Sequence, residues 1–218
     1  MPEILKCMYK LVLIFVFMAG CAEEMAPPPR QPMNNKIIFF GDSLTAGQGV
    51  LPEESFPALI EKKLLADGYA YEVVNAGVSG DTTSSALARI DWVLSGGFTI
   101  IGIELGANDA MRGVPVPETR KNLLQIIHKI RKANPEAGIL LFEMVAFPNM
   151  GKKFAEEFNN MYKEIANSQK IVLVPFFLSG VAGRRKYNQR DGIHPTAEGY
   201  ARIVPNIYPY LRQMLQNF

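Results

Sequence analysis

The chain has 218 residues, of which 48% are hydrophobic and 20% charged, and its formal net charge is +2. This length and hydrophobic content suit one soluble domain with a sizeable core. The near-neutral charge balance argues against a broad phosphate-binding surface, so no nucleic-acid partner is expected.

Residues 1–20 have the pattern of a signal peptide. Two lysines precede the apolar stretch at 11–20, which is shorter than the roughly 20 apolar residues of a membrane span and has the length of a signal-peptide core. The segment Ala19–Cys21 resembles the bacterial lipobox, with Met18 in place of the usual leucine. This resemblance implies that cleavage leaves Cys21 as a lipidated N-terminus.

A lipidated Cys21 places the protein in the cell envelope, anchored through its lipid and facing the periplasm. Ala22, rather than aspartate, follows the cysteine, which implies the outer membrane in a double-membraned bacterium. The alternatives are ordinary secretion or a retained anchor if the lipobox is not used. Residues 21–35 contain three consecutive prolines and no periodicity, which predicts an extended tether before a domain spanning residues 36–218.

From Lys36 onward apolar runs alternate with amphipathic stretches, the pattern of βαβ units around a parallel sheet. Five buried strands covered by helices predict an α/β fold, a three-layer α/β/α sandwich with a five-stranded parallel sheet. Strands are expected at 36–40, 71–75, 99–105, 138–144 and 171–175. Helices are expected at 55–68, 82–97, 118–135, 152–169 and 196–216, the last interrupted near Pro205 and Pro209. In such sheets, ligands bind at the carboxyl ends of the strands.

A serine at the end of the first expected strand points to nucleophilic catalysis. Ser43 lies at a strand-to-helix turn, and a serine hydroxyl needs a neighbouring base to become reactive. Of the two histidines, His128 lies in the middle of a helix and is interpreted as a surface residue. His194 lies in a turn before the last helix, three residues after Asp191, a spacing that lets the carboxylate orient the imidazole. Asp42 is expected to hold the turn rather than to act as the acid.

Two further residues are candidates for stabilising a tetrahedral oxyanion, which needs several preorganised donors. Gly80 has no side chain and can bring its backbone N–H close, and Asn108 can donate through its amide. The backbone N–H of Ser43 is the third candidate. Taken singly, each is better explained structurally: Gly80 as a turn glycine, Asn108 as an asparagine cap and Ser43 as a serine cap.

Four short stretches carry a resemblance to a known family: GDSLTAG at 41–47, NAGVSGDTT at 75–83, LGANDAMRG at 105–113 and DGIHPTAEGY at 191–200. In this order they resemble the four signature blocks of the GDSL or SGNH esterases. MVAFPNMG and VPFFL resemble the branch of the periplasmic thioesterase/lysophospholipase and the secreted arylesterases. The resemblance implies a flavodoxin-like fold and catalysis without metal or other cofactor, with Ser43, Asp191 and His194 as the triad and Ser43, Gly80 and Asn108 as the oxyanion hole. Ala107 stands where the family usually has a second glycine.

The sequence therefore predicts a serine esterase, with possible thioesterase and lysophospholipase activity, that acts on a small ester or lipid. The apolar residues at 144–151 and 111–118 suit an acyl chain or an aromatic ester, and ordinary packing explains them equally well. The basic segment 183–190 is interpreted as a solvated loop, with contact to an anionic substrate group as the alternative. A carbohydrate O-acetylesterase using the same triad and a non-catalytic envelope-binding lipoprotein are the alternative functions. Acyl preference and oligomeric state are not predicted.

Overall fold

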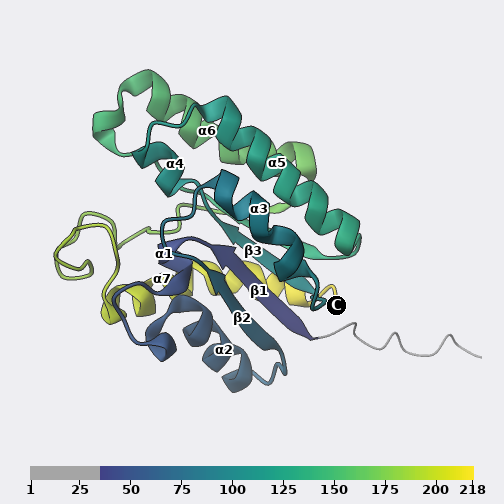
Figure 1. Ribbon diagram of the computed structural model, residues 1–218. Coiled ribbons are helices and arrows are strands. Elements are labelled where there is room, and N and C mark those ends of the chain that lie inside the picture. Colours follow the sequence, from purple (N-terminus) through teal and green to yellow (C-terminus); the bar gives the residue numbers. More distant parts are fainter. Residues whose placement is uncertain (1–34) are drawn as a thin grey trace, which may run out of the picture. The chain divides into compact units, whose positions relative to one another are not determined.

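The computed structural model describes residues 35–218, so the predicted signal peptide, Cys21 and nearly all of the predicted tether lie outside the described residues. Five parallel strands form one sheet in the order β2-β1-β3-β4-β5 (Figure 1). The strands are β1 (Lys36–Gly41), β2 (Glu72–Gly77), β3 (Ile100–Glu104), β4 (Gly138–Phe142) and β5 (Val172–Val174). This confirms the predicted five-stranded parallel sheet.

The central strands β1 and β3 are apolar on both faces because helices cover both sides of the sheet. Gly102 of β3 makes room for aromatic packing, since a Cβ there would lie 2.8 Å from the Phe39 ring and 2.9 Å from the Phe142 ring. Phe56 packs edge-on against both of these rings, and Phe177 packs edge-on against Phe142 and Phe56. These rings form part of the hydrophobic core.

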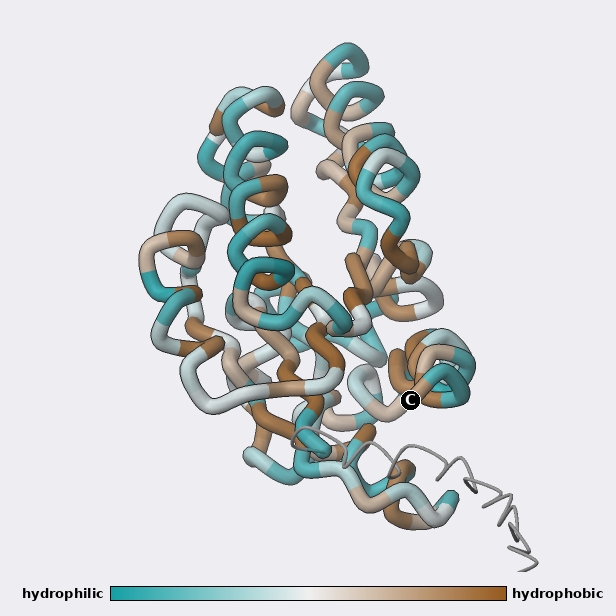
Figure 2. The backbone as a smooth tube through the Cα atoms, turned by 90° about the vertical axis from the view of Figure 1, so that its right-hand side faces the viewer, coloured by the Kyte–Doolittle hydropathy of each residue, from teal (hydrophilic) through white to brown (hydrophobic). Residues whose placement is uncertain are grey.

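Two groups of helices give the fold its outer layers. Helices α3 (Thr83–Leu94), α5 (Val116–Ala133) and α6 (Lys152–Gln169) pack side by side over one face, and α2 (Phe56–Ala66) and α7 (Ala197–Leu215) over the other (Figure 1). Hydrophilic and hydrophobic residues alternate turn by turn along these helices (Figure 2), as expected when one helix face packs on a sheet. The three-layer α/β/α sandwich is confirmed. Within residues 35–218, no helix has both the length and the apolar composition that a membrane span requires.

The predicted interruption of the last helix is wrong, because α7 runs unbroken from Ala197 to Leu215 with Pro205 and Pro209 inside it. Both prolines lie on the exposed face of the helix. The backbone carbonyls that lose their helical partner can therefore be hydrated, which lowers the cost of a proline within a helix. The opposite face, which includes Ile203, Ile207 and Leu211, is buried and keeps the helix on the sheet.

The remaining short elements are α1 (Ser43–Ala46), α4 (Ala107–Met111) and the 3-10 turns η1 (Pro52–Glu54) and η2 (Pro148–Met150). Helix α1 follows β1 after one residue, and α4 follows β3 after two residues. The sequence analysis expected a helix after Ser43 but gave it no bounds, and it did not expect α4, because four or five residues are too few for a periodic pattern. Both lie at the carboxyl edge of the sheet and carry candidate site residues.

Candidate active site

Three candidate residues come from adjacent strands and meet at one edge of the sheet. Ser43 follows β1, Gly80 follows β2 and Asn108 follows β3, and these strands are neighbours. In register, Gly41 at the end of β1 lies opposite Gly77 of β2 and Glu104 of β3. The segments that follow the three strands therefore start from the same level.

The turn that carries Ser43 depends on two glycines. A Cβ on Gly41 would lie 2.1 Å from the Thr45 hydroxyl oxygen, and one on Gly77 would lie 2.2 Å from the Ala46 nitrogen. Helix α1 can therefore lie directly against the strand ends. It ends after one turn at Gly47, which has a left-handed φ of 78°. A single turn has little macrodipole, so any stabilisation of an anion here depends on individual N–H donors. The backbone N–H of Ser43, at the first helical position, is such a donor because it has no acceptor within its own helix.

Ser43, His194 and Asp191 form one hydrogen-bonded chain. His194 Nε2 lies 2.9 Å from Ser43 Oγ, and His194 Nδ1 lies 2.7 Å from Asp191 Oδ2. Asp191 Oδ1 also accepts the backbone N–H groups of Ile193 at 2.9 Å and His194 at 3.0 Å. The bond from the His194 ring, followed by the one from Ile193, lowers the pKa of Asp191 to about 2. The ionised carboxylate favours a proton on Nδ1 and leaves Nε2 able to accept the proton of Ser43.

Gln189 connects the loop that carries His194 to the loop that follows Ser43. Its backbone N–H donates to the His194 carbonyl at 2.8 Å, and its side-chain amide donates to the carbonyls of Gln48 at 2.7 Å and Pro195 at 2.9 Å. These contacts join segments that are far apart in the sequence and hold the imidazole beside the serine. No sequence pattern singled out Gln189, because an isolated glutamine in a loop has no distinctive spacing.

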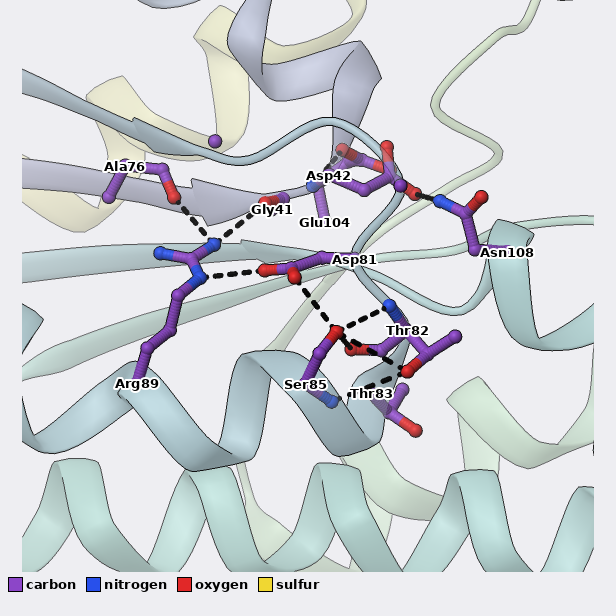
Figure 3. Close-up of polar contacts among 12 residues, drawn as sticks. Gly41, Asp42, Ala76, Asp81, Thr82, Thr83, Ser85, Arg89, Glu104 and Asn108 are labelled. Carbon is purple, nitrogen blue, oxygen red and sulfur yellow. Dashed lines mark hydrogen bonds and ion pairs between the residues drawn. The ribbon is translucent and has the colours of Figure 1, made fainter.

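Asp42 orients Asn108, the candidate oxyanion donor. The Asn108 amide donates to Asp42 Oδ2 at 2.9 Å (Figure 3). Asp42 Oδ1 accepts the backbone N–H of Leu44 at 2.9 Å. Asp42 thus holds the Ser43 turn, as the sequence analysis expected, and fixes the amide as well. A carboxamide carries two N–H donors, so the second hydrogen of Asn108 remains available to a substrate oxygen.

Glu104 lies beneath this pair and was missed by the sequence analysis. Its side chain is fully buried, and its Oε2 accepts the Thr45 hydroxyl at 2.8 Å and the Asp42 backbone N–H at 3.4 Å. Within residues 35–218 no donor reaches Oε1. The available signal was one acidic residue in the otherwise apolar stretch TIIGIEL.

The two buried carboxyl groups hold their protons more tightly than ordinary carboxyl groups do. Burial first, and the neighbouring Asp42 charge second, raise the pKa of Glu104 well above its ordinary value. Burial also raises the pKa of Asp42 to about 6, against the lowering effect of its hydrogen bonds with Leu44, Glu104 and Asn108. Adjacent carboxyl groups cannot both ionise cheaply. Of the two, Glu104 is therefore the group that keeps its proton to higher pH.

Arg89 holds the loop that contains Gly80 in place through hydrogen bonds and an ion pair. Its Nη2 donates to the carbonyls of Gly41 at 3.0 Å and Ala76 at 2.9 Å, and its Nε donates to Asp81 Oδ2 at 2.6 Å (Figure 3). One guanidinium thus ties together the ends of β1 and β2 and the residue after Gly80. Gly80 has a φ of 84°, a left-handed conformation that favours glycine. The sequence analysis singled out Gly80 but not Arg89, whose spacing within α3 is that of an ordinary surface arginine.

An apolar cavity of about 430 Å³ opens beside the chain of three residues. Its walls include Leu44, Ala107 and Ile193, the sequence neighbours of Ser43, Asn108 and His194. The predicted acyl-binding stretch 144–151 contributes residues 144–147, whereas the stretch 111–118 contributes only Met111. His128, the other histidine, is exposed on α5, as expected.

Comparison with known proteins agrees with this geometry. Residues 39–202 match the GDSL-like Lipase/Acylhydrolase family. Esterase TesA of Pseudomonas aeruginosa is 36% identical over 201 residues, covering 92% of this chain and 98% of that protein. Thioesterase 1/protease 1/lysophospholipase L1 of Escherichia coli is 32% identical over 189 residues, covering 83% of each.

A solved structure extends the likeness to the fold. The psychrotrophic esterase EstA from a Pseudoalteromonas species, inhibited by monoethylphosphonate, superposes with a TM-score of 0.79 at 32% identity, covering 84% of this chain and 100% of that one. The resemblance predicted from the four sequence blocks is confirmed. The chain belongs to the GDSL-like lipase/acylhydrolase family and is a carboxylic ester hydrolase with the SGNH hydrolase fold.

Proposed function

We propose that Ser43 is the nucleophile of this ester hydrolase, that His194 is its general base and acid, and that Asp191 orients the imidazole. The observation that carries this proposal is the contact of 2.9 Å between His194 Nε2 and Ser43 Oγ, together with that of 2.7 Å between His194 Nδ1 and Asp191. Both lie within the range in which a base takes a proton from a nucleophile.

The reaction proceeds in two half-reactions. Ser43 Oγ attacks the substrate carbonyl carbon while its proton passes to His194 Nε2, and the tetrahedral intermediate collapses as His194 returns this proton to the leaving alcohol or thiol. Water then attacks the acyl-enzyme and gives a proton to His194, and the carboxylic acid leaves as Ser43 regains its hydrogen. Asp191 stays ionised throughout because its pKa is about 2.

Charge that develops on the carbonyl oxygen is met by the N–H groups of Ser43 and Gly80 and by the free amide hydrogen of Asn108. Two features support Asn108 in this role. It is 8% exposed, so its interaction with an oxyanion is little screened by water. Its amide is also held by Asp42 before any substrate binds, which avoids a reorganisation cost in the transition state.

The apolar cavity supports acyl esters with hydrocarbon or aromatic acyl groups over acetylated carbohydrate. A carbohydrate needs polar groups around its hydroxyls, whereas this cavity is lined mainly by methionine, phenylalanine and aliphatic side chains. The names of the relatives, an esterase and a thioesterase/lysophospholipase, are consistent with substrates of this kind.

The experiment combines covalent labelling with a series of p-nitrophenyl esters from acetyl upward. A phosphonate reagent should add one adduct, located by mass spectrometry on Ser43, and abolish hydrolysis. Ser43→Ala and His194→Ala should each lose nearly all activity, and the double variant should be little worse, because the two residues act as a unit. His128→Ala is the matched control and should keep wild-type turnover. Near wild-type turnover in folded Ser43→Ala would refute the assignment.

We further propose that Cys21 is lipidated and anchors the domain to a membrane facing the periplasm, as the lipobox-like sequence implies. Mass spectrometry of the mature N-terminus tests this. Cys21→Ser should abolish the lipid mass and release the protein from the membrane fraction, whereas Cys7→Ser, in the segment expected to be removed, should change neither. An unmodified mature chain that starts elsewhere than Cys21 would contradict the anchor.

A further inference from the structure

Two of the proposed oxyanion donors, Gly80 and Asn108, belong to segments that the sheet does not join directly. Gly80 lies in the loop between β2 and α3, whereas Asn108 lies in α4, which follows β3. Strand β1 lies between β2 and β3 in the sheet. Donors stabilise an oxyanion only if they are held at the right spacing before the charge develops. The side-chain contacts that join these two segments therefore matter for catalysis.

The first of these contacts is buried. Asp109, the residue after Asn108, accepts the backbone N–H of Thr83 at 2.8 Å and the Thr83 hydroxyl at 2.5 Å. Asp109 is 1% exposed, and Thr83 is fully buried. Thr83 is the first residue of α3 and comes three residues after Gly80. This contact fixes α4 against the start of α3, but it does not reach Gly80 itself.

The second contact lies at the surface and does reach Gly80. Arg112 Nη2 donates to the Gly80 carbonyl at 2.9 Å. The backbone N–H of Arg112 donates to the Asn108 carbonyl at 3.1 Å, so Arg112 comes one helical turn after Asn108 and on the same side of α4. The guanidinium thus connects the residue that carries one donor to the helix that carries the other.

Gly80 depends on such a contact because its own backbone is permissive. The Asp81 N–H donates to the Val78 carbonyl at 3.1 Å, which closes a tight turn with Gly80 in its third position. The φ of 84° at Gly80 is that of a type II turn. Arg89 holds Asp81 at the end of the turn, but glycine adopts a φ of either sign with little cost. Arg112 restricts the residue with the greatest backbone freedom in this turn.

We propose that Arg112 is a positioning residue that sets the spacing between the Gly80 and Asn108 donors, so that both reach the same substrate oxygen. This inference rests on the proposed serine esterase function and adds a residue to it. Arg112 is exposed, so its hydrogen bond contributes only modestly to stability. Removing a whole oxyanion donor lowers kcat by about 10² to 10³. A donor that is displaced rather than removed should cost less, and we expect about tenfold.

The test compares Arg112→Ala with Arg131→Ala in the hydrolysis of p-nitrophenyl acetate. Arg131 is a matched control because its exposed side chain also donates to a backbone carbonyl, that of Gln169. Arg131 lies near the end of α5, just before β4 begins, and therefore at the opposite edge of the sheet. Arg112→Ala should lower kcat about tenfold with KM within about twofold of the wild type. Arg131→Ala should keep both constants, and urea denaturation should show a similar small loss of stability in the two variants.

A boronic acid inhibitor reports on the oxyanion hole without turnover. The Ser43 oxygen adds to boron while its proton passes to His194, which gives a tetrahedral anion that resembles the reaction intermediate. Its inhibition constant should rise in Arg112→Ala by about the factor by which kcat falls. It should stay at the wild-type value in Arg131→Ala. A merely structural role would lower stability and leave this constant unchanged in the folded protein.

The double variant Asn108→Ala/Arg112→Ala separates positioning from a general disturbance of the site. If Arg112 acts through the spacing of the two donors, its loss should cost less than about twofold once the Asn108 amide is absent. A tenfold loss that persists in this background, or equal kcat in Arg112→Ala and Arg131→Ala, overturns the proposal. A loss that disappears as salt rises also overturns it, because that would be a long-range effect of charge. If a phosphonate reagent labels a residue other than Ser43, the proposed function fails instead.

Discussion

Replacing Glu104 by glutamine tests whether the buried pair beneath the nucleophile holds a proton. A glutamine amide keeps the shape of the side chain and donates a hydrogen bond, as a protonated carboxyl does. If Glu104 is protonated in the wild type, Glu104→Gln should fold normally and keep kcat within about threefold, since less than ~0.7 kcal/mol of transition-state stabilisation would change.

The stability of the two proteins should then diverge with pH in a defined direction. The folded wild type keeps the proton of Glu104 above 4.5, the ordinary value at which the unfolded chain releases it. The folded state therefore binds more protons than the unfolded state, and the free energy of unfolding falls as pH rises. A difference of one bound proton between the two states changes the free energy of unfolding by about 1.4 kcal/mol per pH unit. Between pH 6 and 7, the wild type should therefore lose stability relative to Glu104→Gln, by at most about this amount for the single proton of Glu104.

Urea denaturation at the two pH values measures this difference, and ester hydrolysis at saturating substrate measures kcat. Glu53→Gln, a change at an exposed carboxyl, is the control and should run parallel to the wild type. Glu104→Leu removes both the donor and the acceptor, so it should lower kcat about tenfold through a looser Asp42 while KM changes little. A parallel pH dependence of the free energy of unfolding in wild type and Glu104→Gln would show that Glu104 is not protonated in the folded state. Loss of activity in folded Glu104→Gln would show that an ionised Glu104 is required.

Three further outcomes are expected. Asn108→Ala should lower kcat by about 10² to 10³ with little change in KM, and normal kcat in the folded variant would remove Asn108 from the oxyanion hole. Arg89→Met should lower the free energy of unfolding by about 3 kcal/mol, because it leaves Asp81 buried and unpaired, and adding Asp81→Asn should recover part of this in urea denaturation. Phe147→Ala should raise KM for long-chain esters and leave acetyl esters unchanged, since Phe147 lines the apolar cavity; equal losses on both esters would place Phe147 outside the acyl site.

The central strands of the sheet could be predicted because they are apolar runs bounded by turn residues. Parallel strands covered on both faces have no alternating pattern. In β1 every residue after Lys36 is buried, and in β3 every residue is buried. The last helix was the exception. Two prolines normally break a helix, but their effect depends on which face they occupy, and only the packing of α7 shows that both face solvent.

The hydrogen-bonded chain at the site could be predicted because the chemistry restricts the candidates. A serine hydrolase needs a histidine, the sequence has only two, and Asp191 lies within reach of His194 in the same turn. The supporting residues could not be found in this way. Asp42 meets Glu104 across 62 residues of sequence, and Arg89 contacts Gly41 across 48. These contacts depend on the order and register of β2, β1 and β3, which no local pattern reveals.

The placement of Asp42 carries an electrostatic cost that the proton on Glu104 limits. A carboxylate that holds the Asn108 amide also repels the negative charge that develops on the substrate oxygen nearby. With both carboxyl groups ionised, two negative charges would act against the oxyanion in a poorly hydrated site, where such repulsion is strong. With Glu104 protonated, one charge remains, and it is spread over hydrogen bonds to Leu44 and Asn108. The site thereby keeps a fixed amide donor, which preorganises the oxyanion hole, at the electrostatic cost of a single carboxylate.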